Sequence, residues 1–462
     1  MRAVAVVSSM AVLPGAEERL AGFRAGWYRC LPRWADTLFE LTDAVLCAGG
    51  PVTSLPRLSL EPVCRRGHGS QYAALAQGRV DAGALEDLLA WFRPAGWPLV
   101  FAVDTTTWPR VAAETSPERG LYYHPSRQTR GKPVVPGWCY QKVSQLCFGR
   151  DSWVWPVSCR RIAPGADLAA ATVSQVAAAA GRVAGAGPVP LFAFDAGPGY
   201  DPAALSHGLA ACRAQVLIRL RKDRVLLRDP PARAPHATGR PRRHGAPFAC
   251  KDERTWGVPD ARLVTGDPVY GTVTVRGWAR LHPRTRRAGR WAGPAPAPIV
   301  RGWVIRVEVT STPRPASKAG KMLWLWWSGP PGTTPDLDTC WRAYVHRFDI
   351  EHAIRFAKTT LGWTRPALRH PDQADRWTAI ILAACAQLVL ARPLAADRRL
   401  PWERPRDPAQ LTPGRVRRDF SRLRSALPSV ARPRKPCRPG PGRPKGRPTR
   451  HARRYPVIKK TT

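Results

Sequence analysis

Apolar residues recur at helical spacing through the first 95 residues of the chain. We expect helices over residues 16–30, 32–47 and 82–92, where apolar side chains return every three or four positions. A Gly-Gly-Pro sequence at 49–51 interrupts the pattern, and Thr53 or Ser54 could cap a short helix after it. The pattern fits a helix-turn-helix-like DNA reader and an ordinary helical bundle equally well, so both remain open.

Continuous apolar runs replace this pattern after residue 97. The runs at 99–103 and 189–194 are typical of buried central strands, and each is followed directly by an aspartate, Asp104 or Asp195. The intervening and following segments predict two strands within 134–162, a strand at 214–220, and helices at 168–183 and 205–212. Together they predict a mixed five-stranded α/β sheet with flanking helices.

The second half of the chain begins with alternating patterns that are rich in Pro and Arg. We expect strands at 262–264, 271–276 and 300–309, a basic loop at 231–244, and a buried strand at 322–327. A long helix is predicted over 338–361, with Asp336 as its N-cap and Gly362 as its stop. Further helices are expected at 376–390 and 412–427.

These patterns divide the chain into five consecutive parts. They are a helical region that is a candidate for DNA binding (1–95), the first part of an α/β core (96–222), a β-rich insertion with a basic loop (223–320), the second part of the core (321–395), and a basic helix with a disordered tail (396–462).

The charge balance points to a polyanionic partner. The chain has 462 residues and a net charge of +40, from 73 Lys and Arg against 33 Asp and Glu. Residues 432–462 alone hold twelve Lys or Arg and no acid. Such an excess predicts salt-dependent binding to nucleic acid. A ribosomal-type or chromatin-type binder and an Arg-rich coding bias are the alternative explanations.

Cysteine usage and hydropathy indicate a reducing compartment and no membrane. The eleven cysteines are scattered and form no CxxC pair, which disfavours a zinc site or a disulfide framework. The apolar run at 379–391 is too short to span a bilayer and predicts a buried helix. The first 14 residues only faintly resemble a signal peptide. We therefore expect a cytoplasmic protein.

Asp104 and Asp195 are the first candidate site residues, because ligands gather at the carboxyl ends of strands in open α/β sheets. Two neighbouring carboxylates repel each other unless a cation neutralises them, and a divalent ion with oxygen ligands would do so. Either residue, taken alone, could equally be an ordinary capping or turn aspartate.

Glu351 is the third candidate. On one continuous helix, Glu351 would share a stripe about 80° wide with four polar or basic residues, namely Tyr344, Arg347, Arg355 and Lys358. A solvated helix face stabilised by i,i+4 ion pairs would have the same pattern. His346 and His352 fall outside the stripe or at its margin and are interpreted as structural.

The spacing of four of these residues resembles a known signature. Tyr344-x2-Arg347-x3-Glu351-x6-Lys358 is similar to the Y-x2-R-x3-E-x6-K pattern of DDE-type insertion-sequence transposases. The segments around Asp104 (Val-Asp-Thr-Thr-Thr) and Asp195 (Phe-Asp-Ala-Gly-Pro-Gly-Tyr) resemble the two Asp-bearing strands of that family. The 156 residues from Asp195 to Glu351 resemble the subgroup with a β-rich insertion before the Glu helix.

The resemblance implies a ribonuclease H-like core over roughly residues 97–392. It also implies that Asp104, Asp195 and Glu351 are catalytic and hold two Mg²⁺ ions about 3.5–4 Å apart, with Mn²⁺ as a substitute. Tyr344, Arg347, Arg355 and Lys358 would contact DNA. The implied partners are the terminal inverted repeats of a mobile element, its target DNA, and a second copy of the chain in a synaptic complex.

Other features are less specific. Arg240 and Arg443 lie in Gly-Arg-Pro sequences that resemble the core of AT-hooks, although the usual Arg before the Gly is missing. Trp324 and its neighbours could stack on an extruded base, but core packing is the simpler reading. The rival functions are a catalytically decayed or domesticated DNA-binding protein, a Mg²⁺-dependent nuclease that does not rejoin DNA, and an architectural protein without a catalytic centre.

Overall fold

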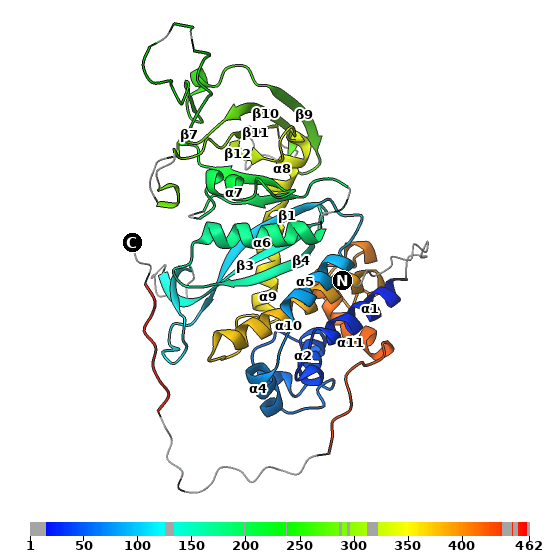
Figure 1. The fold of residues 1–462 in the computed structure, drawn as a ribbon. Helices are drawn as coiled ribbons and strands as arrows, with labels where there is room; N and C mark the ends of the chain where they lie inside the picture. The colour runs from blue at the N-terminus through cyan, green and yellow to red at the C-terminus, as the bar shows by residue number, and fades with distance from the viewer. Residues whose placement is uncertain are drawn as a thin grey trace, which may run out of the picture. The chain divides into compact units, whose positions relative to one another are not determined.

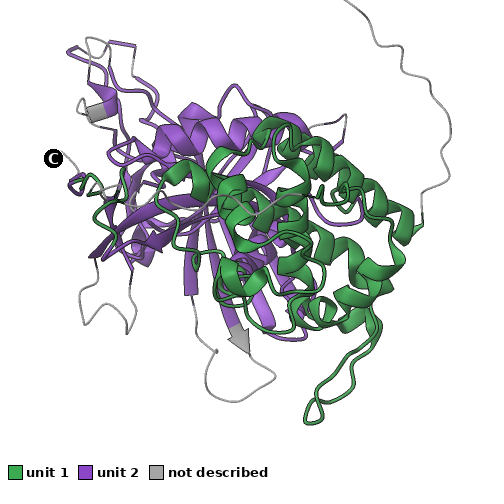
Figure 2. Ribbon diagram, turned by 90° about the horizontal axis from the view of Figure 1, so that it is seen from below, with its two compact units in different colours: residues 1–94, 113–117, 354–455 green, residues 95–112, 118–353, 456–462 purple. Residues whose placement is uncertain are grey.

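The chain folds into two compact units that each use separate stretches of sequence. The computed structural model describes residues 15–459 apart from 125–133, 184, 186, 198, 234, 237, 286–288, 293–295, 312–321, 437–445 and 447–450. The first, helical unit comprises residues 1–94, 113–117 and 354–455, and the second, sheet unit comprises 95–112, 118–353 and 456–462 (Figure 2). Each unit is described here by itself.

The helical unit combines helices from both halves of the chain. Its N-terminal members include α1 (Ala16–Arg29), α2 (Ala35–Cys47), α4 (His68–Gln77) and α5 (Ala82–Phe92), with the single turn α3 (Leu55–Leu58). Its C-terminal members are α10 (Pro371–Ala391) and α11 (Pro413–Ala426), which pack against α2 and against each other. The predicted helices at 16–30, 82–92 and 412–427 are confirmed.

One helix is long and apolar enough to cross a membrane. Among the described residues this is Pro371–Leu394, but 67% of its most apolar stretch is buried inside the protein. It therefore has the character of a core helix, as its pattern predicted.

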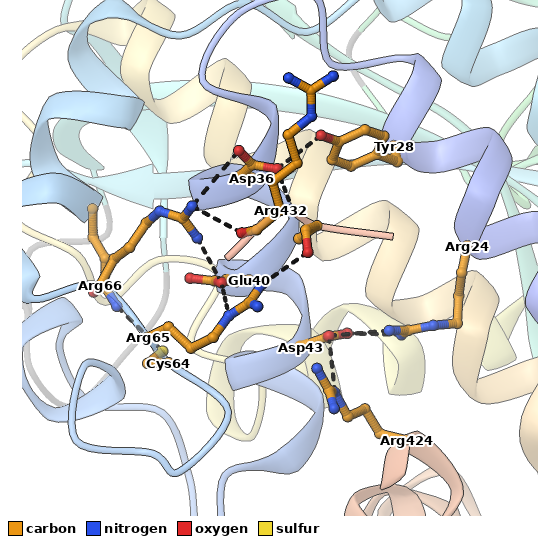
Figure 3. Close-up of polar contacts among 12 residues, drawn as sticks. Arg24, Tyr28, Asp36, Glu40, Asp43, Cys64, Arg65, Arg66, Arg424 and Arg432 are labelled. Carbon is orange, nitrogen blue, oxygen red and sulfur yellow. Dashed lines mark hydrogen bonds and ion pairs between the residues drawn. The ribbon is translucent and has the colours of Figure 1, made fainter. Parts of the chain in front are cut away.

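A polar network runs along α2 inside the helical unit. Asp36, Glu40 and Asp43 are one helical turn apart and face arginines from distant segments (Figure 3). Glu40 accepts hydrogen bonds of 2.6 Å from both Arg65 and Arg66. Arg24 and Arg424, from two other segments, pair with Asp43, so the network fixes the packing of three segments around α2.

The sheet unit is built on a mixed sheet of ten strands. The order is β2-β3-β1-β5-β6-β12-β11-β10-β9. The tenth strand, β4, pairs with residues 139–146 of β3, and β2 pairs with residues 134–137 of the same strand. The five expected strands are β4 (Val154–Ile162), β3 (Val134–Leu146), β1 (Val100–Pro109), β5 (Leu191–Phe194) and β6 (Gln215–Leu220). Strands β1, β5 and β6 are parallel neighbours, whereas β3 is antiparallel to β1.

The β-rich insertion extends this sheet. Its strands are β9 (Ala261–Asp267), β10 (Gly271–Leu281) and β11 (Gly302–Ser311), followed by β12 (Met322–Ser328), which pairs antiparallel with β6. The sheet is therefore twice as wide as the five strands expected, because β6 would otherwise be an unpaired edge. A separate two-stranded sheet joins β7 (Val225–Leu227) to β8 (Pro247–Ala249).

Helices cover both faces of the sheet (Figure 1). On one face α7 (Pro202–Gly208) packs beside α6 (Leu168–Val183), and Trp326 donates a hydrogen bond of 2.9 Å to Ser206 of α7. Helix α8 (Leu337–His346) packs on the opposite face, where its first residue, Leu337, lies next to Gly277 of β10. The carboxyl ends of the parallel strands thus lie between two helical layers.

Two predicted elements differ in extent. Strand β1 does not end at Asp104 but continues to Pro109, because the β-branched residues 105–107 pair with β3. The predicted helix 338–361 is two helices, α8 and α9 (Phe348–Thr359), separated at Arg347.

The far end of the basic tail is ordered rather than disordered as predicted. Ile458 donates its backbone N–H to the Arg119 carbonyl at 2.8 Å and pairs in parallel with Gly120 of β2 (Gly120–Tyr123). It thereby protects part of an edge strand.

Candidate active site

Two aspartates become neighbours through the register of β1 and β5. Val103 lies opposite Phe194 in the parallel ladder, and Asp104 and Asp195 are the next residue of each strand. Both carboxylates therefore project from the same edge of the sheet, one strand apart. The apolar residues before them are fully buried, which anchors this edge in the core.

Asp195 is held by donors from α8 and by its own turn. The Tyr344 hydroxyl donates to its Oδ1 at 3.1 Å, and the backbone N–H of Ala196 donates to the same oxygen at 2.8 Å. Arg347 donates to its Oδ2 at 3.3 Å. Burial raises the pKa of the Tyr344 phenol, and Asp195 raises it further, so Tyr344 stays a hydrogen-bond donor.

Arg347 brings Glu351 to the same place. Its Nη2 atom, which lies 3.3 Å from Asp195, lies 3.0 Å from Oε1 of Glu351. The guanidinium is 1% exposed and stacks over the Phe348 ring at 4.8 Å. Arg347 is the single residue between α8 and α9, and its backbone N–H donates to the carbonyls of residues 343 and 344. Two of the three acids predicted from the sequence therefore contact one guanidinium, and its charge also acts on the third, Asp104.

Asp104 has the most perturbed carboxyl group at this site. Burial raises its pKa to about 6, Arg347 opposes the rise, and Glu351 and Asp195 add to it. Burial also lowers the pKa of Arg347, but Asp195, Tyr344 and the other carboxylates outweigh burial and raise it. The positive charge of Arg347 is therefore too small to offset the burial of the Asp104 carboxyl and the two neighbouring acids.

The donor set suits a divalent cation. Three carboxylates supply the hard oxygens that Mg²⁺ and Mn²⁺ prefer, and the raised pKa of Asp104 shows that more positive charge would be stabilising. Within the described residues, no three His, Cys, Asp or Glu side chains form a ready metal site. The physical reason is Arg347, whose Nη2 lies between Asp195 and Glu351 and whose buried Nε has no hydrogen-bond partner in the described part of the chain.

A cavity of about 900 Å³ opens beside these acids. Asp104 and Glu351 line it together with Tyr200 and, from the tail, Lys459. The Tyr200 hydroxyl accepts a hydrogen bond of 3.0 Å from Gln141, and burial raises its pKa. The space is large enough for a nucleotide segment to approach the carboxylates.

The remaining predicted residues lie elsewhere. Arg355 is exposed on α9 and Lys358 is half-buried in its last turn, and both belong to the helical unit. Arg240 is exposed in the basic loop, and Arg443 lies outside the described residues. The three tryptophans at 324, 326 and 327 are buried, in agreement with core packing.

The two histidines of the helices have structural partners. His346 Nδ1 lies 3.0 Å from Asp349, and its ring stacks on Phe148 at 4.9 Å. His352 Nδ1 lies 2.9 Å from the Ser152 hydroxyl. In these interactions neither histidine contacts Asp104, Asp195 or Glu351, which agrees with the structural role predicted for both.

The sequence analysis missed the residues between the strands and α7. Tyr200 and Gln141 were not singled out, although the turn Gly197–Tyr200 directly after Asp195 could have drawn attention to Tyr200. Arg219 was also missed, yet it lies 3.6 Å from Asp195 because β6 is the parallel neighbour of β5. Strand adjacency, not sequence spacing, brings it there.

The mixed sheet, its flanking helices and the carboxylates at its edge define a ribonuclease H-like α/β protein. The chain belongs to the DDE superfamily of endonucleases, since the model of the family described as DDE superfamily endonuclease matches residues 27–284, more than half of its length. Asp104 and Asp195 lie inside the matched segment and Glu351 lies beyond it. No curated protein matches the chain. Membership supports a nuclease-type or transposase-type enzyme that acts on DNA, and nucleases of this superfamily usually use divalent metals.

Proposed function

We propose that this chain is the transposase of a mobile insertion element, which cuts DNA at the element ends and joins them to target DNA. The observation that supports this most strongly is the contact of one Arg347 nitrogen with both Asp195 and Glu351, next to Asp104. Two acids that are far apart in sequence thereby contact one side chain, and both act electrostatically on Asp104. The Y-x2-R-x3-E-x6-K resemblance supports transposition as the outcome of the cleavage.

In this proposal Asp104, Asp195 and Glu351 hold two Mg²⁺ ions, and Mn²⁺ can substitute. When bound, the ions supply Lewis-acid chemistry that activates the attacking oxygen and stabilises the leaving 3′ oxygen. The protein side chains need form no covalent bond with DNA. Water is the first nucleophile, and the freed 3′-OH of the element end is the second.

The neighbouring residues prepare the site for this chemistry. Tyr344 orients Asp195 through its hydroxyl, and Arg347 keeps Asp195 and Glu351 together in the metal-free protein by neutralising them. The Arg347 guanidinium would also be a donor for a phosphate oxygen of DNA at this site. Arg355 and Lys358 would bind DNA as well.

Transposition also requires partners. We infer that two copies of the chain bridge two terminal inverted repeats in a synaptic complex, and that they act in the cytoplasm. Arg240 and Arg443 in the basic segments would add phosphate contacts that depend on salt rather than on sequence.

The test is a cleavage and joining assay on two substrates. Labelled duplex oligonucleotides that carry the inverted repeats flanking the coding region are incubated with supercoiled plasmid, in Mg²⁺ or in EDTA. We expect nicking and joined product only with Mg²⁺, and neither product from Asp195→Asn. This variant keeps the size of the side chain and loses its charge.

Each alternative function has its own outcome. Mg²⁺-dependent nicking without joining would identify a nuclease that does not transfer strands. Specific binding of the repeats without nicking would identify a decayed or domesticated DNA-binding protein. Nicking that persists unchanged in Asp195→Asn would remove Asp195 from the catalytic site.

A further inference from the structure

A second cavity, of about 800 Å³, shares Gly197 and Tyr200 with the 900 Å³ cavity that Asp104 and Glu351 line. Cations dominate its charged lining, which consists of Arg219, Arg221, Arg224 and Arg284 with two acids, Asp201 and Asp223. We call it the arginine cavity. It lies entirely within the sheet unit, so its geometry is that of a single compact body.

The strand register places this cavity next to the candidate catalytic acids. Phe194 of β5 lies opposite Ile218 of β6, and Asp195 and Arg219 are the residues that follow. Their side chains approach to 3.6 Å. The arginine cavity therefore begins one strand away from Asp195, just as Asp104 on β1 lies one strand away on the other side.

The ion pairs within the cavity leave its arginines available to a ligand. The Arg219–Asp195 and Arg224–Asp201 pairs are long, at 3.6 and 3.7 Å, compared with about 2.8 Å for a strong charge-assisted hydrogen bond. Arg221 has a shorter contact of 3.0 Å with Asp223, but its side chain is 78% exposed. Such exposed pairs are weak and exchange readily for a stronger anion.

The lining also indicates which part of a nucleic acid would enter. Tyr200 is the one aromatic residue among the lining residues described, and it is only 7% exposed, with its ring packed against Phe194. The cavity thus offers guanidinium groups for phosphates but no free aromatic face on which a base could stack. This composition suits the sugar–phosphate backbone rather than a nucleobase or a free nucleotide.

We propose that the arginine cavity binds consecutive backbone phosphates of the DNA strand whose scissile phosphate lies at Asp104, Asp195 and Glu351. This inference rests on the proposed function, because it takes the carboxylates as the point of cleavage. Arg221 and Arg224 make the main phosphate contacts, since their ion pairs are with Asp223 and Asp201 and not with Asp104, Asp195 or Glu351. Arg219 lies at the junction of the two cavities and guides the strand from one to the other.

The test measures DNA binding without cleavage. Fluorescence anisotropy with a labelled duplex in EDTA gives the dissociation constant at a series of salt concentrations. We expect the double variant Arg221→Gln/Arg224→Gln to bind more weakly and to lower the slope of log K against log salt by about 2, one for each lost phosphate contact. The matched control is Arg254→Gln/Arg262→Gln, which removes the same charge from exposed positions outside the cavity.

The outcomes separate this inference from the proposed function. A slope equal to that of the control would overturn the arginine cavity as a DNA site even if the wild-type chain cuts and joins DNA. The expected slope change in a chain that neither cuts nor joins would retain the cavity and remove the transposase. Inorganic phosphate binding that is lost in the double variant, together with an affinity for DNA that the double variant leaves unchanged, would assign the cavity to free phosphate and overturn the inference.

Discussion

Replacement of Asp104 by Asn is expected to abolish DNA cleavage and, in the absence of metal, to stabilise the protein at neutral pH. Loss of a carboxylate ligand should slow cleavage by about 10³-fold, which corresponds to several kcal/mol of transition-state stabilisation. The stabilisation has a different origin. Burial raises the pKa of Asp104 to about 6 from 3.8, so the folded protein binds its proton more tightly than the unfolded chain does.

The sign of the pH dependence follows from that difference. Well below pH 3.8 the carboxyl is protonated in both states, and as the pH rises to 6 the unfolded chain ionises first, so the free energy of unfolding falls. The loss is about 2–3 kcal/mol at pH 7, and an asparagine does not suffer it. Denaturation in EDTA should therefore show that Asp104→Asn is stabilising at pH 7 and that this stabilisation disappears as the pH is lowered to about 3.

The control is Asp87→Asn on the exposed side of α5, which should leave both cleavage and the pH dependence unchanged. A metal-free Asp104→Asn variant that is no more stable than wild type at pH 7 would contradict the electrostatic account of the site.

Replacement of Asp43 by Ala is expected to destabilise the helical unit by about 3–5 kcal/mol. Asp43 is 1% exposed and accepts hydrogen bonds of 2.7 and 3.0 Å from the equally buried Arg24. Arg24 also donates to Gln387 of α10 at 2.7 Å, and Arg424 of α11 approaches Asp43 at 3.3 Å. Removal of Asp43 leaves the Arg24 guanidinium buried without its counter-charge, which is the costly case.

Native-state hydrogen exchange of the α2 amides would measure this loss, because it reports on the helical unit separately from the sheet. The matched variant Arg24→Met/Asp43→Leu removes both charges and should recover much of the lost free energy of unfolding. Protection of α2 that falls by less than about 1 kcal/mol in Asp43→Ala would show that the pair does not hold the unit together.

Much of the sheet and part of the site could be predicted from the sequence. The apolar runs before Asp104 and Asp195 identify two buried strands, because both runs are short and lie in segments without helical spacing. Their parallel pairing then follows from the intervening helical segment, since parallel neighbours need a crossover. The convergence of both acids is a consequence of those two facts.

The role of Arg347 could not be predicted from helical periodicity. The pattern from 338 to 361 fits one helix, and on one helix Arg347 belongs to a solvated stripe that faces DNA. In the structure the helix breaks at Arg347, and the buried side chain contacts Asp195, 152 residues away in sequence. Local pattern carries no information about a counter-charge that arrives from another strand.

The insertion and the arginine cavity were hidden for the same reason. Alternating positions in β9–β11 predict strands but not which edge they will pair with, so the extension of the sheet beyond β6 depends on tertiary structure. Arg219, Arg221, Arg224 and Arg284 are inconspicuous in a chain with 73 Lys and Arg. Their significance is spatial.

The contact of α2 with α10 and α11 has a consequence for biosynthesis. When α2 leaves the ribosome, the segments that cover it have not been made, because more than three hundred residues separate Cys47 from Pro371. At ordinary translation rates, tens of seconds pass between the synthesis of α2 and that of α10. During this time the sheet can fold, but the apolar sides of the first helices stay exposed. This nascent protein therefore depends on protection of its earliest segment until its late helices arrive.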